Sequence, residues 1–154
     1  MYGPDTAAVA TPIGLVLIEG DDVIRSIRFH ASGEAKPAST SAVREAAAQV
    51  AAYFAGELTV FDLPLAPTAT PRGGVLRQAM VEIGYGTTAG YGEIATRIGS
   101  SARALGQACA RNPFPLVVPC HRVLQADGVL GPYSAGEGPV TKRWLIDFEA
   151  SKVD

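Results

Sequence analysis

The pattern of apolar and polar residues predicts a small antiparallel sheet and a helix in the first third of the chain. Three short segments rich in apolar residues are separated by the turn residues Pro12-Ile13 and Gly20-Asp21-Asp22. The predicted strands cover residues 8–11, 14–19 and 23–29. The spacing then changes to that of a helix, with apolar residues at Val43, Ala47, Val50 and Phe54. Thr40 or Ser41 can cap this helix, and Gly56 ends it.

A proline-rich stretch then divides the chain. Residues 61–71 contain three prolines, a composition that sustains neither a helix nor a central strand. We therefore expect an N-terminal α/β domain over residues 1–67, a connector over residues 68–72 and a C-terminal domain over residues 73–154.

Helical spacing dominates the second half. The predicted elements are a helix from Val75 to Ile83, helices over residues 91–98 and 101–111 with Gly99-Ser100 between them, an apolar strand over residues 112–118, and a last helix that packs Val140, Trp144, Leu145 and Phe148. The short pair with its glycine turn is typical of a helix-turn-helix. The expected fold class is α+β: a small N-terminal antiparallel sheet with a helix, then a mainly helical domain with a winged-helix-like helix-turn-helix.

Composition indicates a globular chain without a strong overall signal for nucleic acid. The 154 residues are 47% hydrophobic and carry a formal net charge of −2. No apolar run approaches the roughly 18 residues of a membrane span, and the start of the chain lacks signal-peptide features, so we expect a cytoplasmic protein.

The charge is unevenly distributed along the chain. Residues 1–71 carry four basic and eight acidic side chains, a net of −4, whereas residues 72–154 carry nine basic and seven acidic ones, a net of +2. Between Tyr91 and Arg122 four arginines face one glutamate, a net of +3. This is a modest footprint for a phosphate backbone, and a solvated arginine-rich face explains it equally well.

One cysteine offers the clearest candidate chemistry. Cys120 is followed directly by His121 and Arg122, which place a base and a positive charge beside a potential nucleophile. The thiolate is the reactive form, and a free thiol with a pKa of about 8.5 is only slightly ionised near neutral pH. The alternative is a small buried hydrophobe, as most free cysteines are. Cys109, on a predicted helix, is expected in the core, and neither cysteine is expected to form a disulfide.

Further motifs accompany Cys120 in a characteristic order. The strongest are Ala102-Arg103-Ala104-Leu105-Gly106, Asn112-Pro113, Pro119-Cys120-His121-Arg122-Val123 and Lys142-Arg143-Trp144-Leu145, and weaker ones are Tyr91-Gly92-Glu93-Ile94-Ala95 and Thr11-Pro12-Ile13-Gly14. Together they resemble the O6-alkylguanine-DNA alkyltransferase family, the methylated-DNA–protein-cysteine methyltransferases. In that family the N-terminal domain is ribonuclease-H-like.

The resemblance implies direct DNA repair by a protein that is consumed in one turnover. Cys120 matches the acceptor that takes the alkyl group from O6-alkylguanine, with O4-alkylthymine as a candidate second substrate. His121 matches the base that removes the thiol proton through a water, and Glu149 matches the carboxylate that orients the imidazole. Tyr91 matches the hydroxyl that donates to the flipped purine. No cofactor and no metal are implied.

The resemblance also implies contacts with double-stranded DNA on its minor-groove side. Arg103 matches the arginine that replaces the extruded base, and small residues around it, Ala102, Ala104 and Gly106, would let the helix approach the duplex. The remaining implied roles are stacking for Tyr133, binding of the guanine oxygen for Ser134, carbonyl contacts to the guanine amino group for Cys120 and Val123, support of the turn before the active site for Asn112, and support between domains for Arg122. A monomer is expected, with no membrane contact.

The sequence departs from the family pattern at three points. The turn Gly99-Ser100-Ser101 is shorter than usual, which affects the angle of the recognition helix, and the loop over residues 134–142 is longer, which affects the pocket. At the start of the second domain this chain has Arg72-Gly73-Gly74, where members of the family usually have other residues. Some members bind zinc in the first domain, but residues 1–71 hold no cysteine and only His30, so we expect no such site.

Two other functions fit parts of the pattern. One is a non-catalytic sensor that flips and marks the alkylated base, although such sensors lack the acceptor cysteine. The other is a cysteine hydrolase that uses Cys120, His121 and Glu149, but a nucleophile and base adjacent in sequence seldom meet triad geometry.

Overall fold

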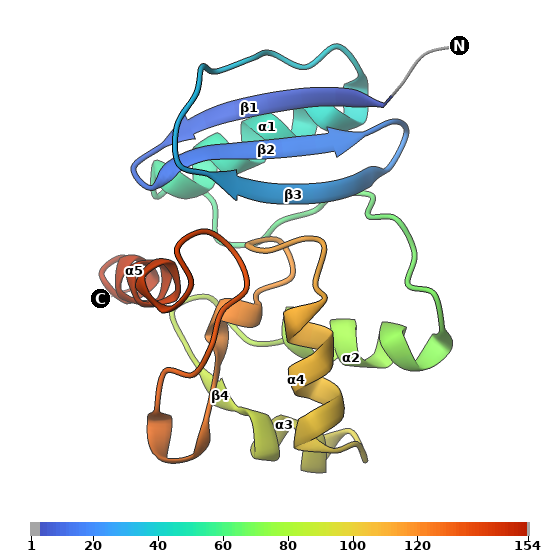
Figure 1. The fold of residues 1–154 in the computed structure, drawn as a ribbon, viewed down its shortest axis with the longest axis vertical. Helices are drawn as coiled ribbons and strands as arrows, with labels where there is room; N and C mark the ends of the chain where they lie inside the picture. Colours follow the sequence, from blue (N-terminus) through green and yellow to red (C-terminus); the bar gives the residue numbers. More distant parts are fainter. Residues whose placement is uncertain (1–3, 154) are drawn as a thin grey trace. The chain divides into compact units, whose positions relative to one another are not determined.

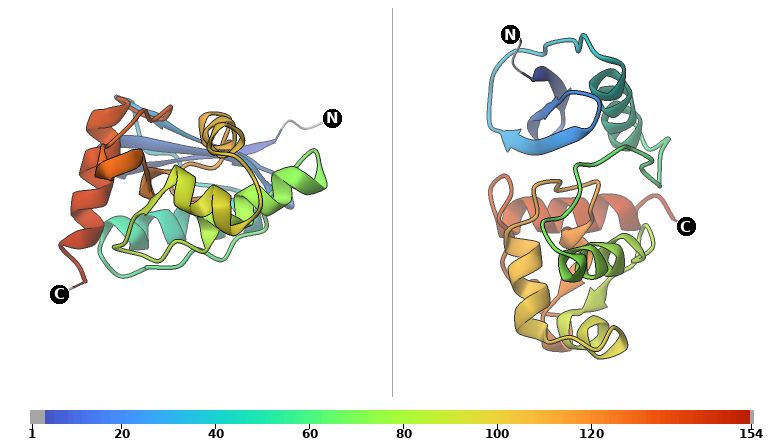
Figure 2. Two further views of the ribbon diagram at one scale, coloured as in Figure 1. Left: turned by 90° about the horizontal axis from the view of Figure 1, so that it is seen from below. Right: turned by 90° about the vertical axis from the view of Figure 1, so that its right-hand side faces the viewer.

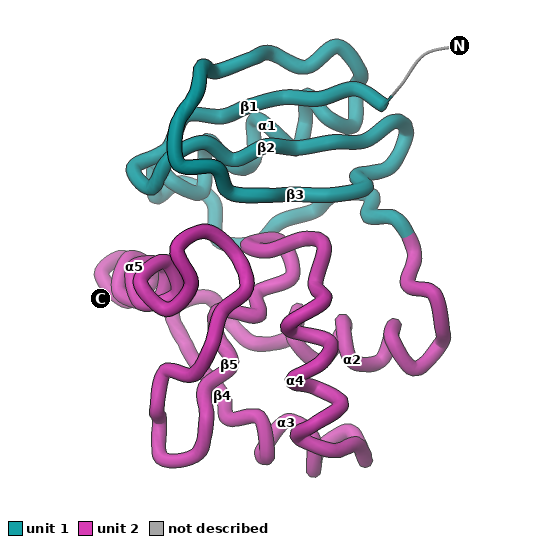
Figure 3. The backbone as a smooth tube through the Cα atoms, viewed as in Figure 1, with its two compact units in different colours: residues 1–66 teal, residues 67–154 magenta. Residues whose placement is uncertain are grey.

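The computed structural model describes residues 4–153, and the chain forms two compact units, residues 1–66 and 67–154 (Figure 3). The border between them lies within the proline-rich stretch. Among the described residues, no helix is long and apolar enough to cross a membrane.

Unit 1 is a three-stranded antiparallel sheet with one helix on one of its faces (Figures 1 and 2). The strands are β1 (Asp5–Thr11), β2 (Gly14–Gly20) and β3 (Ile24–His30), and β2 lies in the centre. Gly14 adopts a φ of 106°, and a Cβ there would lie 2.5 Å from the carbonyl oxygen of His30, so the turn into β2 requires glycine. The predicted sheet is confirmed.

Helix α1 (Ser41–Phe54) supplies the other layer of unit 1. Its buried residues are Val43, Ala46, Val50 and Tyr53. The helical spacing predicts Ala47 and Phe54 on this stripe, but Ala46 and Tyr53 are buried in their place, because three- and four-residue spacings both keep to one helix face. The Asp5 carboxylate accepts hydrogen bonds from the backbone N–H groups of Ser39 and Thr40, which joins the start of β1 to the start of the helix.

Unit 2 is mainly helical. Its elements are α2 (Pro71–Val81), β4 (Ala89–Gly90), α3 (Tyr91–Arg97), α4 (Ala102–Ala110), β5 (Val123–Leu124) and α5 (Pro139–Ala150). The two short strands pair in parallel, and they join residues from before the helix pair to residues after it. With the sheet of unit 1, this arrangement confirms the α+β class.

Helix α2 begins earlier than its apolar stripe indicates. Thr70 caps it by accepting a 3.0 Å hydrogen bond from the Gly73 N–H, and Pro71 occupies the first turn, where a missing N–H is harmless. The helix therefore starts inside the stretch expected as a connector. Val75, expected on the buried stripe, is 43% exposed, and Leu76, Ala79 and Met80 are the buried residues.

The shortened turn between α3 and α4 closes without a proline. Gly99 adopts a φ of 67°, and the Ser101 hydroxyl caps α4 by accepting from the Ala104 N–H at 3.0 Å. The Arg72 guanidinium, from the start of α2, donates to the Gly99 carbonyl at 3.1 Å. A capped helix and a glycine turn thus form the predicted helix pair.

The strand expected over residues 112–118 is wrong. Prolines at 113, 115 and 119 remove backbone donors, and Leu116 has a φ of 81°, which no strand accommodates. This segment is a compact loop that leads into a 3₁₀ turn at Cys120–Arg122 and only then into β5.

The last helix buries Leu145 as predicted, but its other buried residues differ from the predicted Val140, Trp144 and Phe148. Val140 is 67% exposed, whereas Lys142, Leu145 and Glu149 are buried. The apolar stripe alone could not reveal this, because two of the buried side chains carry charge.

Candidate active site

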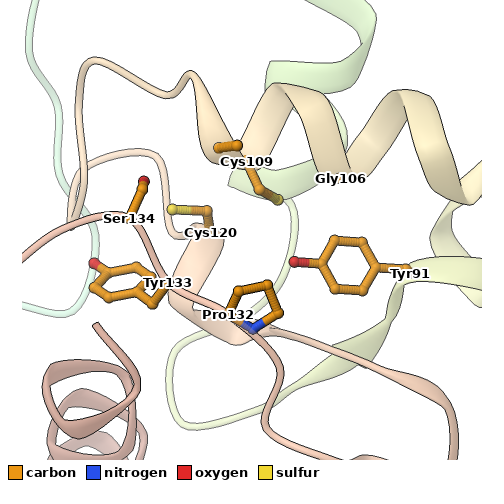
Figure 4. A pocket seen from close by; sticks show the side chains of 8 residues that line it. Tyr91, Gly106, Cys109, Cys120, Pro132, Tyr133 and Ser134 are labelled. Carbon is orange, nitrogen blue, oxygen red and sulfur yellow. The ribbon is translucent and has the colours of Figure 1, made fainter.

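A small pocket in unit 2 brings together residues that are far apart in the sequence. Its volume is about 130 Å³, and its lining includes Tyr91, Gly106, Cys120, Tyr133 and Ser134 from the predicted site. Tyr91 enters from one side with its hydroxyl pointing inward, and Pro132, Tyr133 and Ser134 follow one another along the opposite wall (Figure 4). Helix α4 contributes Gly106, Cys109 and Ala110 to the lining.

The loop before Cys120 holds the thiol in place. The Asn112 side-chain amide donates to the Val118 carbonyl at 2.9 Å and to Cys120 Sγ at 3.2 Å, while its oxygen accepts from the Phe114 N–H at 3.0 Å. One side chain thus folds the proline-rich loop and contacts the sulfur. In the structure Asn112 touches the acceptor candidate itself and does not line the pocket.

His121, the residue after Cys120, forms a buried pair with Glu149. His121 Nε2 lies 2.7 Å from Glu149 Oε2, and both side chains are almost completely inaccessible to solvent. Burial lowers the pKa of His121, an effect only partly offset by the carboxylate, so the imidazole stays neutral at neutral pH. Burial alone would raise the pKa of Glu149, but hydrogen bonds from His121 and Arg122 outweigh it and lower the pKa to about 2. An ionised carboxylate therefore faces a neutral imidazole.

This pairing determines which nitrogen of His121 is available as a base. The Glu149 carboxylate only accepts hydrogen bonds, so Nε2 carries the proton and donates it. Nδ1 is then the basic nitrogen, and it has no hydrogen-bond partner among residues 4–153. The pair thus presents an unprotonated nitrogen that is buried from solvent.

Arg122 completes the cluster from the other side. Its Nε and Nη2 donate to the two Glu149 oxygens at 2.8 and 3.0 Å, and its Nη1 donates to the Ile83 carbonyl at 2.7 Å. The Gly86 N–H also donates to Glu149, at 3.2 Å. All these partners belong to unit 2, so the described contacts of Arg122 brace the active site; its expected role between the domains stays a prediction.

Opposing effects act on the pKa of the Cys120 thiol. Burial raises the pKa of this thiol, whereas the hydrogen bond from Asn112 and the positive charge of Lys142 act to lower it. Burial dominates, and Cys120 is held as a thiol. Activation therefore requires a base, and the candidate next to Cys120 in the sequence is the neutral His121.

Lys142 is a site residue that the sequence motifs did not indicate. Its side chain is completely buried, its Nζ donates to the Pro132 carbonyl at 3.3 Å, and it lies 6.0 Å from the centre of the Tyr91 ring. It therefore joins two walls of the pocket. A signal was available: Lys142 shares one helix face with Leu145 and Glu149, at three- and four-residue spacing.

Tyr91 and Cys109 both face the pocket in protonated form. Burial is the main cause that raises the pKa of Tyr91, with nearby Cys109 adding to it, so its hydroxyl is a hydrogen-bond donor. Burial also raises the pKa of the Cys109 thiol to about 12, and its sulfur lies 3.4 Å from Met80 Sδ. Cys109 is buried as expected, yet it also forms part of the pocket wall.

The residues expected to contact DNA lie outside the pocket, with one exception. Ala102 and Arg103 are exposed at the start of α4, and Ala104 follows on the same helix, whereas Gly106 faces both helix surface and pocket. Val123 is buried at the start of β5. Within residues 4–153, no group of three His, Cys, Asp or Glu side chains is arranged to hold a metal ion.

Comparison with known sequences identifies relatives of the whole chain. Residues 75–151 match the family model described as 6-O-methylguanine DNA methyltransferase, DNA binding domain. The methylated-DNA–protein-cysteine methyltransferase of Methanosarcina acetivorans is 40% identical, with 94% of this chain and 97% of the relative covered. The protein of that name from Mycobacterium bovis is 46% identical over 68% of this chain and 63% of its own length.

Solved structures agree with the sequence relatives. A crystal structure of Mycobacterium tuberculosis OGT in complex with DNA has a TM-score of 0.81 and 36% identity, with 94% of this chain and 92% of that chain covered. The Mycobacterium tuberculosis O6-methylguanine methyltransferase has a TM-score of 0.80 and 37% identity over 96% of this chain and 93% of that one. The family match, the full-length relative and the arrangement around Cys120 agree: this chain belongs to the 6-O-methylguanine DNA methyltransferase family.

Proposed function

We propose that this protein repairs DNA directly by moving an alkyl group from the O6 atom of guanine to Cys120, and that it does so once. One observation carries the proposal: Cys120 lines a pocket with Tyr91 and Tyr133, and the next residue in the chain, His121, forms a buried pair with Glu149. A nucleophile, a base and a group that orients the base are thus present together. Membership of the methyltransferase family supports the same reaction.

The proton leaves the thiol toward His121. Glu149 holds the Nε2 proton, so the Nδ1 lone pair is available to accept, and a bridging water relays the thiol proton to it. The resulting imidazolium is stabilised by the ionised carboxylate at 2.7 Å. The positive charge of Lys142 favours the thiolate that forms.

The thiolate then attacks the alkyl carbon in line with the bond to oxygen. The carbon–sulfur bond forms as the carbon–oxygen bond breaks, and the electron pair of the broken bond leaves with the guanine. The protonated Tyr91 hydroxyl donates to the leaving purine, which finally takes up one proton in place of the alkyl group. The product is a thioether, which has no hydrolysable bond, so each molecule acts once.

The lesion must leave the duplex before it reaches Cys120. Flipping a base costs a few kcal/mol, and less for a damaged or mispaired base. We assign the minor-groove approach to α4, with the exposed Arg103 filling the space left by the base. The substrate is then double-stranded DNA that contains O6-alkylguanine, and the protein acts as a monomer in the cytoplasm.

Mass spectrometry after incubation with an O6-methylguanine oligonucleotide tests the proposal. Trypsin cleaves after Arg103, Arg111 and Arg122, so Cys109 and Cys120 fall in separate peptides, residues 104–111 and 112–122. We expect one methyl group on the peptide with Cys120, none on the peptide with Cys109, and no transfer in Cys120→Ser.

Two other outcomes would overturn the proposal. Tight binding of the lesion without any methylated cysteine would assign the protein to the non-catalytic sensors. Ester hydrolysis beyond one equivalent of protein would instead revive the cysteine hydrolase.

A further inference from the structure

A second hollow in unit 2 lies on the far side of the recognition helix from the Cys120 pocket. We call it the α2–α4 groove. Its volume is about 510 Å³, and its lining residues come from the end of the connector, from α2, from α4 and from the loop after α4. Cys120 is not among them, so the groove is separate from the proposed reaction site.

All charged side chains that line the groove are positive. Arg72 and Arg77 come from α2, Arg111 follows the end of α4, and no aspartate or glutamate is among the lining residues. Polar side chains at the edges, those of Thr68, Thr70, Gln107 and Asn112, add hydrogen-bonding groups. Arginine side chains with neutral polar neighbours suit an anionic partner.

The three arginines are held in different ways. Arg77 is half-buried and stacks its guanidinium 5.1 Å from the centre of the Phe114 ring. Arg72 is exposed and uses one of its five N–H groups on the Gly99 carbonyl, at 3.1 Å. Arg111 is exposed at the rim. Two of the three guanidinium groups are thus exposed, and the third is anchored against an aromatic ring.

The groove continues the surface assigned to DNA. Ala104 belongs to the DNA-facing residues of α4 and also lines the groove, and the small side chain of Ala108 follows one turn later. The side chain of Arg72 reaches the turn that precedes α4, so the start of α2 and the start of the recognition helix lie side by side. A DNA backbone that continues past the recognition helix on this side would therefore enter the groove.

We propose that the α2–α4 groove binds the phosphate backbone of duplex DNA beside the lesion, with Arg72 and Arg111 as its phosphate contacts. This rests on the proposed function, because DNA must already lie on α4. It extends that function by a contact that positions the duplex without reading its sequence. Part of the excess positive charge between Tyr91 and Arg122 then lies in the groove, which Arg111 lines together with Arg72 and Arg77 from α2.

The salt dependence of DNA binding tests the groove. Each phosphate contact contributes about 0.9 to the slope of log affinity against log salt for duplex DNA. Arg111→Gln should lower this slope by about 1 and weaken binding about fivefold near 0.15 M salt. The loss should be equal for undamaged and O6-methylguanine duplexes. Arg72→Gln with Arg111→Gln should lower the slope by about 2.

Matched variants separate charge from folding. Arg111→Lys keeps the charge and should retain most of the slope, whereas Arg44→Gln removes an exposed arginine of unit 1 and should change nothing. Thermal unfolding of each variant checks that the fold is intact. A wild-type slope in a folded Arg72→Gln, Arg111→Gln double variant would overturn the proposal and leave the groove to a partner other than DNA.

The free base separates this proposal from the proposed function. Transfer from free O6-methylguanine to Cys120 needs no duplex, so the ratio of the duplex rate to the free-base rate should fall in Arg111→Gln. If the wild-type protein methylates Cys120 with neither substrate, the proposed function fails. If the wild type transfers normally and the ratio does not change, only the groove fails.

Discussion

Arg122 and Arg111 add the same unit of charge to the sequence, yet they belong to opposite regions of unit 2. Arg122 is buried behind Cys120 and makes hydrogen bonds to both oxygens of Glu149 and to the Ile83 carbonyl. Arg111 is exposed at the rim of the α2–α4 groove. The charge of Arg122 is paired with Glu149 inside the protein, whereas the charge of Arg111 is accessible to a binding partner. Net charge along a segment therefore says little about binding until the structure separates the two kinds.

The largest expected effect is on stability, from removal of the buried arginine. Arg122→Gln leaves the Glu149 carboxylate without its main counter-charge in a dry interior and should destabilise the protein by about 3 to 5 kcal/mol. Arg111→Gln is the matched control and should change stability by less than about 0.5 kcal/mol. Urea unfolding of both variants measures the difference. Equal losses would break the comparison.

The pH dependence of stability should report the same buried cluster. The pKa of Glu149 is lowered to about 2 in the folded protein, so its contribution is fully present above the unfolded value near 4.5 and is lost as pH falls toward 2. The stability gap between the wild type and Glu149→Gln should stay constant from about pH 7 to pH 5 and be about 2 kcal/mol smaller near pH 3. A gap that does not change with pH would mean that the carboxylate is not held ionised.

Lys142 differs from both arginines, because it is buried and its charge acts on the reactive sulfur. Its charge acts to lower the pKa of Cys120, so Lys142→Met should raise that pKa and slow alkyl transfer about tenfold at neutral pH. The defect should shrink as pH rises, which a purely structural role of Lys142 would not produce. Lys142→Arg keeps the charge and serves as the comparison. Rates over a range of pH values decide the matter.

The smallest expected effect concerns the wall of the groove. Ser101→Ala removes the cap of α4 and should destabilise the protein by about 1 kcal/mol, and DNA affinity should fall with the order of the helix. Ser100, one residue earlier, does not cap the helix, so Ser100→Ala is the control. Urea unfolding and duplex binding together test this. No difference between the two variants would show that packing alone holds the recognition helix.

Several parts of the fold were predictable because they depend on local rules. The strands of unit 1, the helix pair with its glycine turn and the α+β class all follow from short apolar segments, helical spacing and turn residues. The strand over residues 112–118 was predicted wrongly because its apolar residues indicated a strand, whereas its two prolines, Pro113 and Pro115, oppose one. The burial of Lys142 in place of Val140 was hidden, because a stripe drawn from apolar residues omits buried charges.

The candidate site divides in the same way. Cys120, His121, Tyr91 and Glu149 could be named from the order of motifs, and the structure places Tyr91 beside Cys120 and pairs His121 with Glu149. Asn112 was named as a support of the turn, but its contact with the sulfur required the folded loop. Their roles in the reaction stay predictions until the transfer assay is performed.

The sequence by itself determined the family, the local elements and the identity of the candidate nucleophile, because each depends on residue type and spacing along the chain. Only the tertiary structure decided which nitrogen of His121 is available, how Lys142 reaches the pocket and which arginines remain accessible. These properties depend on burial and on partners from distant segments, such as Glu149 for His121 and Arg122. Burial changes the free energy of a charge by several kcal/mol, and no count of residues along a chain contains that quantity.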